Sequence, residues 1–279
     1  MAGRSLLALS ASALVLCLLP VTAQAQYAQR KVVTTNGAIT FTGNALGLDA
    51  AKDDNGQGTR GAIGTFITTD STQQDLSPAP NKAPAFPPGT TNDWHLNRSA
   101  AQLRLPAGSH VVYAELIWGG TVAGSDPADN IEAFIDDPVL FTTPLGTSSV
   151  APDAATGRRA GNVSGRGTCN ACFYVRTADV TTLVTAAGAG TYAVGRVPAT
   201  QGTNDNQNGA AGWTLAVFYE DQTQPVRNLL LYLGLEKSGG VDTLSGFCTP
   251  ATGTVPARVA VTAMEGDAKA TGDGLLLGA

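Results

Sequence analysis

The stretch Val111-Val112-Tyr113-Ala114-Glu115-Leu116-Ile117-Trp118 is the most strand-like run in the chain. Its apolar side chains occupy both odd- and even-numbered positions, so both faces of the strand are apolar. A strand with one face in water instead alternates apolar and polar residues. The run therefore predicts a central strand covered on both faces and ended by Gly119-Gly120. Glu115 is the one charged residue in it, so we expect that carboxylate to be buried and bonded to an arginine or to a backbone group.

Strand-like patterns recur on both sides of this run, with turn residues between them. They lie at residues 39–44, 62–69, 101–105, 131–135, 139–143, 173–175, 192–197, 213–219, 229–235 and 259–264. The Pro-rich segment 71–92 and the segment 144–168 are expected to be loops. Thr177 and Gly188 suit the two ends of a helix near 177–187. We therefore predict an all-β fold, an antiparallel β-sandwich or jelly-roll with one short helix.

Composition supports this fold class and excludes several functions. The chain has 33 Gly and 15 Pro, and only 14% of its residues are charged, which is typical of strands and tight turns. Its formal net charge is −5, which argues against nucleic acid as a partner because that would call for a basic face. Only two histidines are present, so a metal centre built on three histidines is excluded.

Residues 1–25 read as a secretory signal peptide. Arg4 supplies the positive start, residues 6–19 form the apolar region, and Ala23-Gln24-Ala25 is a small-x-small cleavage site before Gln26. Without this leader, 16 basic and 22 acidic residues leave a net charge of −6. No later segment is long and apolar enough to cross a bilayer, so we expect a secreted or surface-displayed chain with no transmembrane segment after signal removal.

Residues 26–279 are expected to form a single β-sandwich domain. The chain ends on an apolar triplet, Leu275-Leu276-Leu277. This triplet indicates either a strand truncated at the C-terminal end of the domain or a terminal strand that docks into the sheet. The long segments 71–92 and 144–168 are expected to carry the contacts with other molecules, because recognition residues concentrate on loops held by a rigid scaffold.

Three cysteines remain after removal of the leader: Cys169, Cys172 and Cys248. Outside the cytoplasm a structural disulfide is the expected state, either between Cys169 and Cys172 or from one of them to Cys248. The longer loop closed by the second pairing would stabilise more. One thiol is left over in either case, and a zinc site is the less favoured alternative.

Three passages together resemble one family. They are Gly43–Leu48 with Gly61–Thr68, Tyr113–Gly120, and Ala211–Glu220 followed by Pro225–Asn228. They are similar to the N-terminal domain of large bacterial cell-surface proteins, which often precedes DUF11-type immunoglobulin-like repeats. The resemblance implies an exported, β-rich, surface-displayed module with no well-established enzymatic activity, and it carries over no catalytic residues.

Trp94 is the best candidate for ligand binding, because it stands among polar residues beside the long 71–92 loop. A sugar ring could stack on it, with Asp93 and His95 as hydrogen-bond partners. Two oxygen-rich turns, with Asp53 and Asn55 in one and Asp205 in the other, raise calcium as a cofactor. The first turn lacks the glutamate that an EF-hand requires at its twelfth position, so ordinary turn chemistry is the favoured interpretation and no cofactor is expected.

Catalytic signals are weak. No G-x-S-x-G motif occurs, a triad would have to recruit His95 or His110, and Glu115 with Glu132 is only a conceivable carboxylate pair. We therefore predict a non-enzymatic structural or adhesion module of a bacterial cell-surface protein, with an extracellular protein or glycan as partner. A carbohydrate-binding module is the alternative, and a hydrolase is the third hypothesis.

Overall fold

The computed structural model describes residues 27–50, 62–76, 86–122, 130–160, 172–201, 209–235, 243–246, 252–253 and 256–262. Within these ranges the chain forms thirteen strands, one α-helix and two short 3-10 helices. Their bounds are β1 Ala28–Ala45, β2 Gly47–Asp49, β3 Ile63–Ile67, β4 Thr90–Thr91, η1 Trp94–Leu96, β5 Arg98–Leu103, β6 His110–Thr121, η3 Glu132–Phe134, β7 Val139–Thr143, β8 Gly146–Val150, β9 Arg158–Ala160, β10 Phe173–Asp179, α1 Thr181–Ala187, β11 Gly190–Gly195, β12 Ala211–Glu220 and β13 Val226–Leu233.

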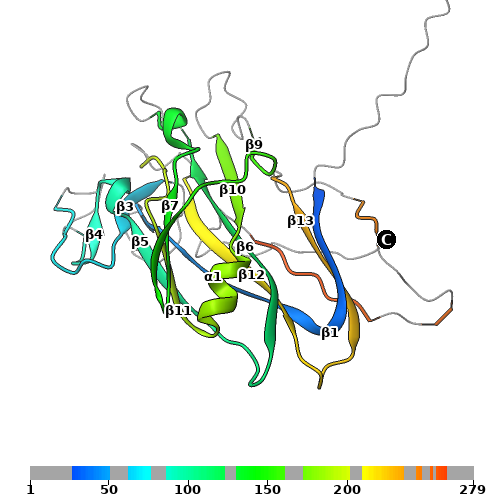
Figure 1. Ribbon diagram of the computed structural model, residues 1–279. Coiled ribbons are helices and arrows are strands. Elements are labelled where there is room, and N and C mark those ends of the chain that lie inside the picture. The colour runs from blue at the N-terminus through cyan, green and yellow to red at the C-terminus, as the bar shows by residue number, and fades with distance from the viewer. Residues whose placement is uncertain are drawn as a thin grey trace, which may run out of the picture.

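The strands form antiparallel sheets packed as in a β-sandwich, which confirms the predicted all-β class (Figure 1). The largest sheet has the order β13-β1-β12-β6-β10-β9, and we call its β1-β12-β6-β10 part the central sheet. A second sheet has the order β5-β11-β7-β8, and a small third sheet has the order β2-β3-β4. Side chains of the central and second sheets, among them Trp118, Tyr174, Phe141 and Tyr192, interdigitate as one apolar core.

Strand β6 lies inside the central sheet, between β12 and β10. Leu116 and Trp118 point into the core between the sheets, while Tyr113 and Ile117 belong to a second buried cluster on the opposite face. The prediction of a strand covered on both faces is confirmed. The prediction that Gly119-Gly120 ends it is wrong, because both glycines pair with β10 and β12 and the strand continues to Thr121.

Strand β1 changes direction near its middle, as Figure 1 shows. Its second half pairs with β12 from Gly37 to Ala45, and its first half pairs with β13 from Ala28 to Asn36. At the corner the Asn36 carbonyl accepts a hydrogen bond from the Asp221 amide at 2.8 Å. A Cβ atom on Gly37 would overlap the Tyr219 carbonyl oxygen, so the corner needs a glycine there.

The first half of β1 and β13 form a two-stranded ribbon that helps to cover the outer face of the central sheet. Leu229, Leu231 and Leu233 of β13 lie in one buried cluster with Tyr113 and Phe218 of the sheet. Alternate leucines of this strand therefore share one face. This packing explains how β6 is buried on both faces although the second sheet covers only one of them.

Hydrogen bonds also join the central and second sheets at one side. The Asn44 amide donates to the Ala100 carbonyl at 2.9 Å, and the Thr42 hydroxyl donates to the Gln102 carbonyl at 3.0 Å. These contacts run from β1 to β5, which belong to different sheets. They fix the position of β5 and, through it, of the short helix η1 that precedes it.

The helix forms later than predicted. It spans Thr181–Ala187, while Thr177 belongs to β10 and donates its hydroxyl to Glu115 at 2.5 Å. Pairing of β10 with β6 therefore outcompetes the local helix signal. The predicted closing residue is right, because the Gly188 amide donates to the Val184 carbonyl with a φ of 66°.

Three more local predictions are wrong. Residues 131–135 form no strand, because Ile131 and Ile135 turn into the core on either side of η3. The segment 144–168 contains β8, which pairs with β7, and β9, which pairs with β10. Residues 256–262 contain no strand and are exposed, although alternation predicted one at 259–264. In the segment 71–92 only Thr90–Thr91 is a strand among the residues that the structure describes.

Candidate functional site: an aromatic patch

Asp93, Trp94 and His95, the three residues expected to bind a ligand, lie together at helix η1. Asp93 caps this helix, since its carboxylate accepts from the His95 amide at 2.9 Å. The same oxygen lies 2.7 Å from Nδ1 of His95, which fixes the imidazole. Trp94 stacks on that imidazole, with ring centroids 3.7 Å apart and 23° between the planes. Both Asp93 and His95 are exposed.

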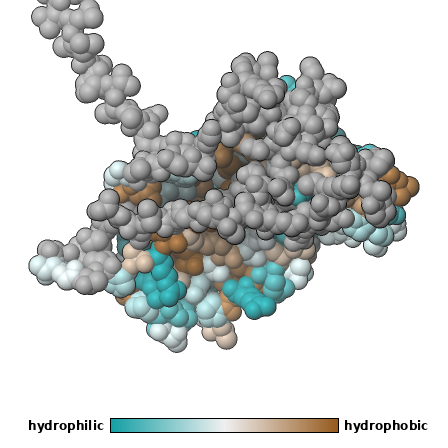
Figure 2. All heavy atoms as spheres, turned by 180° about the vertical axis from the view of Figure 1, so that it is seen from behind, coloured by the Kyte–Doolittle hydropathy of each residue, from teal (hydrophilic) through white to brown (hydrophobic). Residues whose placement is uncertain are grey.

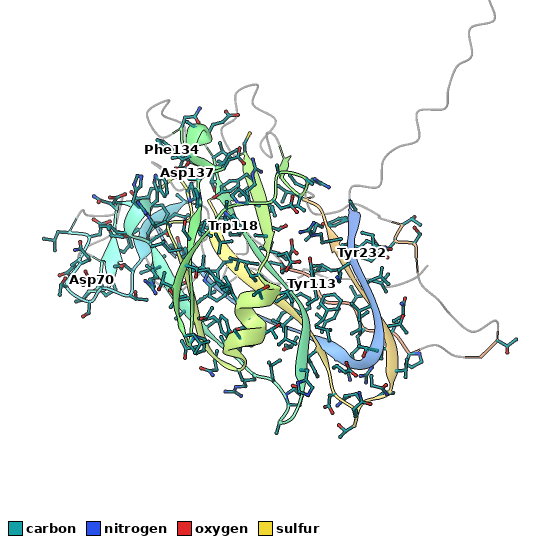
Figure 3. All side chains as sticks on the ribbon, viewed as in Figure 1. Asp70, Tyr113, Trp118, Phe134, Asp137 and Tyr232 are labelled. Atoms are coloured by element: carbon teal, nitrogen blue, oxygen red, sulfur yellow. The ribbon has the colours of Figure 1, made fainter. Side chains whose placement is uncertain are left out.

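Phe134 of η3 completes the group of rings, and no pattern in the sequence pointed to it. Its ring centroid lies 5.7 Å from that of Trp94 and 6.3 Å from that of His95. The residue is 41% exposed, although its neighbours Ile131 and Ile135 are buried. Figure 3 shows Phe134 beside Asp137, far from Tyr232. We call Trp94, His95 and Phe134 the aromatic patch.

The patch rests on elements that are tied to the core. Trp94 is partly buried against the core cluster, and the Ile131 amide at the start of η3 donates to the Val122 carbonyl at 2.9 Å. Asn97, which follows η1, is 1% exposed and bonds both polar groups of Val197: its amide donates at 2.8 Å and its oxygen accepts at 3.0 Å. These bonds hold η1 against the end of β11.

Arg196, next to Val197, brings a positive charge to the patch. It is exposed, and it has a φ of 59°, the left-handed conformation that non-glycine residues avoid. Its amide donates to the Asn97 carbonyl at 3.0 Å. Although partial burial opposes ionisation, hydrogen bonds from His95 and the charge of Arg196 lower the pKa of Asp93. Asp93 is thus a carboxylate at neutral pH.

The other two tryptophans are structural. Trp118 and Trp213 are buried opposite each other on β6 and β12. His110 opens β6 at an exposed position. Figure 2 shows hydrophobic residues gathered in the middle of the face seen from behind, with hydrophilic residues below them.

The expectation for Glu115 is confirmed. Its side chain is completely buried and pairs with Arg30. Glu132, its conceivable partner in a carboxylate pair, is instead exposed on η3. The two acids face different surroundings, so the structure does not bring them together as a catalytic pair.

The residues predicted to bind calcium, Asp53, Asn55 and Asp205, lie outside the described residues. In the part of the chain that the structure does describe, no three His, Cys, Asp or Glu side chains gather closely enough to hold a metal ion. Likewise, no helix in that part has the length and apolar character of a membrane span.

Cys172 immediately precedes β10 and is completely buried. It is disulfide-bonded, and its carbonyl accepts from the Val122 amide at 2.7 Å. Cys169 and Cys248, the two cysteines that could be its partner, lie outside the described residues. Which of them forms the pair therefore stays a prediction.

Fold and site together define a sandwich-like, all-β protein that carries an aromatic patch on the short helices η1 and η3. Comparisons with protein families, with curated proteins and with solved structures gave no match for this chain. Its class is therefore defined by architecture and by this patch, and not by a relative.

Proposed function

We propose that the chain is an exported, surface-displayed module of a bacterial cell-surface protein, which binds a partner without catalysis. The observation that carries this proposal is the aromatic patch. Three rings come together from η1 and η3, and Phe134 stays 41% exposed although its neighbours Ile131 and Ile135 are buried. Exposed aromatic residues on rigid supports are typical of contact sites, because they supply large area at a small cost in side-chain entropy.

The architecture supports a scaffold role. Residues of β5 and β6 lie in the apolar core between the central and second sheets, so little freedom remains in the two strands beside which η1 and η3 are held. The leader-like residues 1–25 support export. In this proposal the sheets hold the patch in place, and the patch makes the contact.

Export is tested by expressing the full chain in the cells that produce it. We expect mass spectrometry to find Gln26 as the N-terminal residue, and we expect protease added to intact cells to remove the chain. A chain that starts at Met1 and survives protease until the cells are lysed would contradict a surface location.

The contact role is tested by retention of the purified chain on cell envelopes of the same organism. We expect Phe134→Ala to reduce retention at least tenfold. Phe41→Ala is the matched control, since Phe41 has a similar exposed fraction of 38% but lies on β1, opposite Ala216 of β12. Equal retention of the two variants would show that the patch is not the contact site.

A further inference from the structure

We infer that the aromatic patch binds a neutral glycan, with Asp93 and Arg196 as its hydrogen-bond partners. This inference rests on the proposed role of the patch as the contact site, and it adds the chemical class of the ligand. It involves no bond making or breaking, only stacking and hydrogen bonds.

The rings fit the apolar face of a pyranose. The axial C–H groups of a sugar carry partial positive charge, and they pack against the electron-rich face of an aromatic ring. Phe134 offers 41% of its surface, and Trp94 is partly exposed beside it with a centroid distance of 5.7 Å. The tilt of 51° between these two rings forms an angled support, which suits a sugar chain better than a flat aromatic ligand.

The polar groups at the patch fit hydroxyls. Asp93 is a carboxylate and only accepts hydrogen bonds, while the guanidinium of Arg196 only donates them. The Arg196 amide donates to the Asn97 carbonyl at 3.0 Å, which places Arg196 beside η1, and its charge contributes to the lowered pKa of Asp93. A hydroxyl-rich neutral ligand can use both groups, whereas a ligand with a net charge would be attracted by one and repelled by the other.

The surroundings of Phe134 argue further against an acidic glycan. Glu132 and Asp137 are both exposed, and the Asp137 amide donates to the Phe134 carbonyl at 2.9 Å. A uronic acid stacked on Phe134 would bring its carboxylate near these side chains. The charges around the patch thus favour a neutral sugar over an anionic one.

The backbone of Arg196 is held in place before any ligand arrives. Its left-handed backbone conformation costs about 1 kcal/mol or more for a residue with a side chain. The hydrogen bonds of Asn97 to Arg196 and Val197 impose this conformation. A backbone fixed in this way loses less entropy on binding than the backbone of a mobile loop.

The test uses the purified full chain and electrophoresis in gels that contain a soluble polysaccharide. The probes are dextran, galactomannan and xyloglucan as neutral polymers, polygalacturonate as an acidic one and chitosan as a cationic one. We expect at least one neutral polymer to retard the chain more strongly than either charged polymer does, and polygalacturonate to bind at least tenfold more weakly.

Matched variants then locate the site. We expect Phe134→Ala to weaken neutral-polymer binding at least tenfold, while Phe41→Ala leaves it unchanged. Arg196→Gln is expected to weaken it about fivefold, the loss of roughly one charge-assisted hydrogen bond, and the exposed Arg104→Gln is its control.

Stronger binding to polygalacturonate or chitosan would overturn the ligand class. Absence of binding to every polymer, or binding that survives Phe134→Ala, would overturn the glycan site itself. The proposed function has its own readouts, which are protease accessibility on intact cells and retention on envelopes. If retention depends on Phe134 but no polysaccharide binds, the glycan inference fails while the contact role stands.

Discussion

Arg30 and Glu115, 85 positions apart in sequence, form an ion pair in which the Arg30 Nε lies 3.2 Å from both carboxylate oxygens. The pair joins the two-stranded ribbon of β13 and the first half of β1 to the outer face of the central sheet. Tyr113 and Thr177 donate their hydroxyls to the same carboxylate, and Asp153 binds the Arg30 guanidinium at 2.9 Å. Although partial burial opposes the charged form, the carboxylate of Glu115 raises the pKa of Arg30.

Removal of this arginine is expected to destabilise the fold strongly. Arg30→Met leaves the completely buried Glu115 without its cation, and we expect a loss of about 3 kcal/mol in the free energy of unfolding. Arg30→Met combined with Glu115→Gln should lose about 1–2 kcal/mol less than the sum of the single variants, because the two residues interact directly. Urea unfolding of the three variants measures this coupling, and strict additivity would show that the ion pair does not hold the ribbon.

The corner in β1 should not tolerate a side chain. Gly37→Ala places a Cβ atom against the Tyr219 carbonyl, so the ribbon must shift away from β12. We expect a loss of about 2–3 kcal/mol, measured by thermal and urea unfolding. Gly108→Ala is the control, since its Cβ would meet open space and only the φ of 79° opposes it, at a cost of about 1 kcal/mol. Equal losses would contradict the close approach at the corner.

The two core tryptophans should respond differently to the same substitution. Trp213 donates its Nε1–H to the Ser99 hydroxyl at 3.0 Å, whereas the Nε1–H of Trp118 has no hydrogen-bond partner among the described residues. Trp213→Phe removes a hydrogen bond in addition to ring volume, and Trp118→Phe removes an unsatisfied donor. We expect the first to cost about 1 kcal/mol more in unfolding free energy. A larger loss for Trp118→Phe would be evidence of an unrecognised partner.

Two buried tyrosines, Tyr174 and Tyr192, should make the folded state less stable at alkaline pH. Burial raises the pKa of Tyr192 to about 12, and it also raises the pKa of Tyr174. The folded state therefore holds these protons more tightly than the unfolded state, whose tyrosines ionise near pH 10. This stabilisation is complete below about pH 10 and is lost as the pH rises through the folded-state pKa values.

Absorbance at 295 nm measures this effect directly. We expect Tyr174 and Tyr192 to stay un-ionised at pH 10.5 in the folded chain and to ionise in urea. The free energy of unfolding should fall between pH 10 and pH 12, and Tyr192→Phe should make that fall smaller. Full ionisation of all tyrosines near pH 10 without urea would contradict their burial.

Substitution of Arg196 should change the stability of the fold and the binding of glycan in opposite directions. Arg196→Gly relieves the left-handed conformation, and we expect it to raise the free energy of unfolding by up to about 1 kcal/mol. The same change removes the cation beside Asp93 and should weaken glycan binding about fivefold. Unfolding curves and gel retardation of this variant, with Arg196→Gln beside it, separate the two effects. A glycine variant less stable than the glutamine variant would mean that the conformation carries no strain.

Local patterns in the sequence led to correct predictions where the residues of one strand show which of its faces are buried. The run around Glu115 predicted a strand buried on both faces and a partner for its carboxylate. The pattern failed where pairing between distant segments outweighed local preference. Thr177 resembles a helix cap, but its register opposite Ile117 places it in β10. Residues 131–135 alternate like a strand, but they form a turn that anchors Phe134.

Some residues of the candidate site could be predicted from the sequence and others could not. Trp94, Asp93 and His95 are neighbours in sequence, so their polar setting was visible there, and their capping contacts are local. Phe134 and Arg196 are 40 and 102 positions from Trp94, and no local pattern links them to it. Only the anchoring of η3 by Ile131 and Ile135, and of the β11 end by Asn97, brings them to the patch.

The sequence by itself determined the all-β class, because apolar alternation and turn residues act over a few positions. Only the tertiary structure decided that β1 folds at Gly37, that Arg30 meets Glu115, and that Phe134 joins Trp94. Each of these depends on contacts between segments far apart in the chain. Such contacts depend on how surfaces fit after the sheets have formed, and that fit is not encoded in any single stretch of residues.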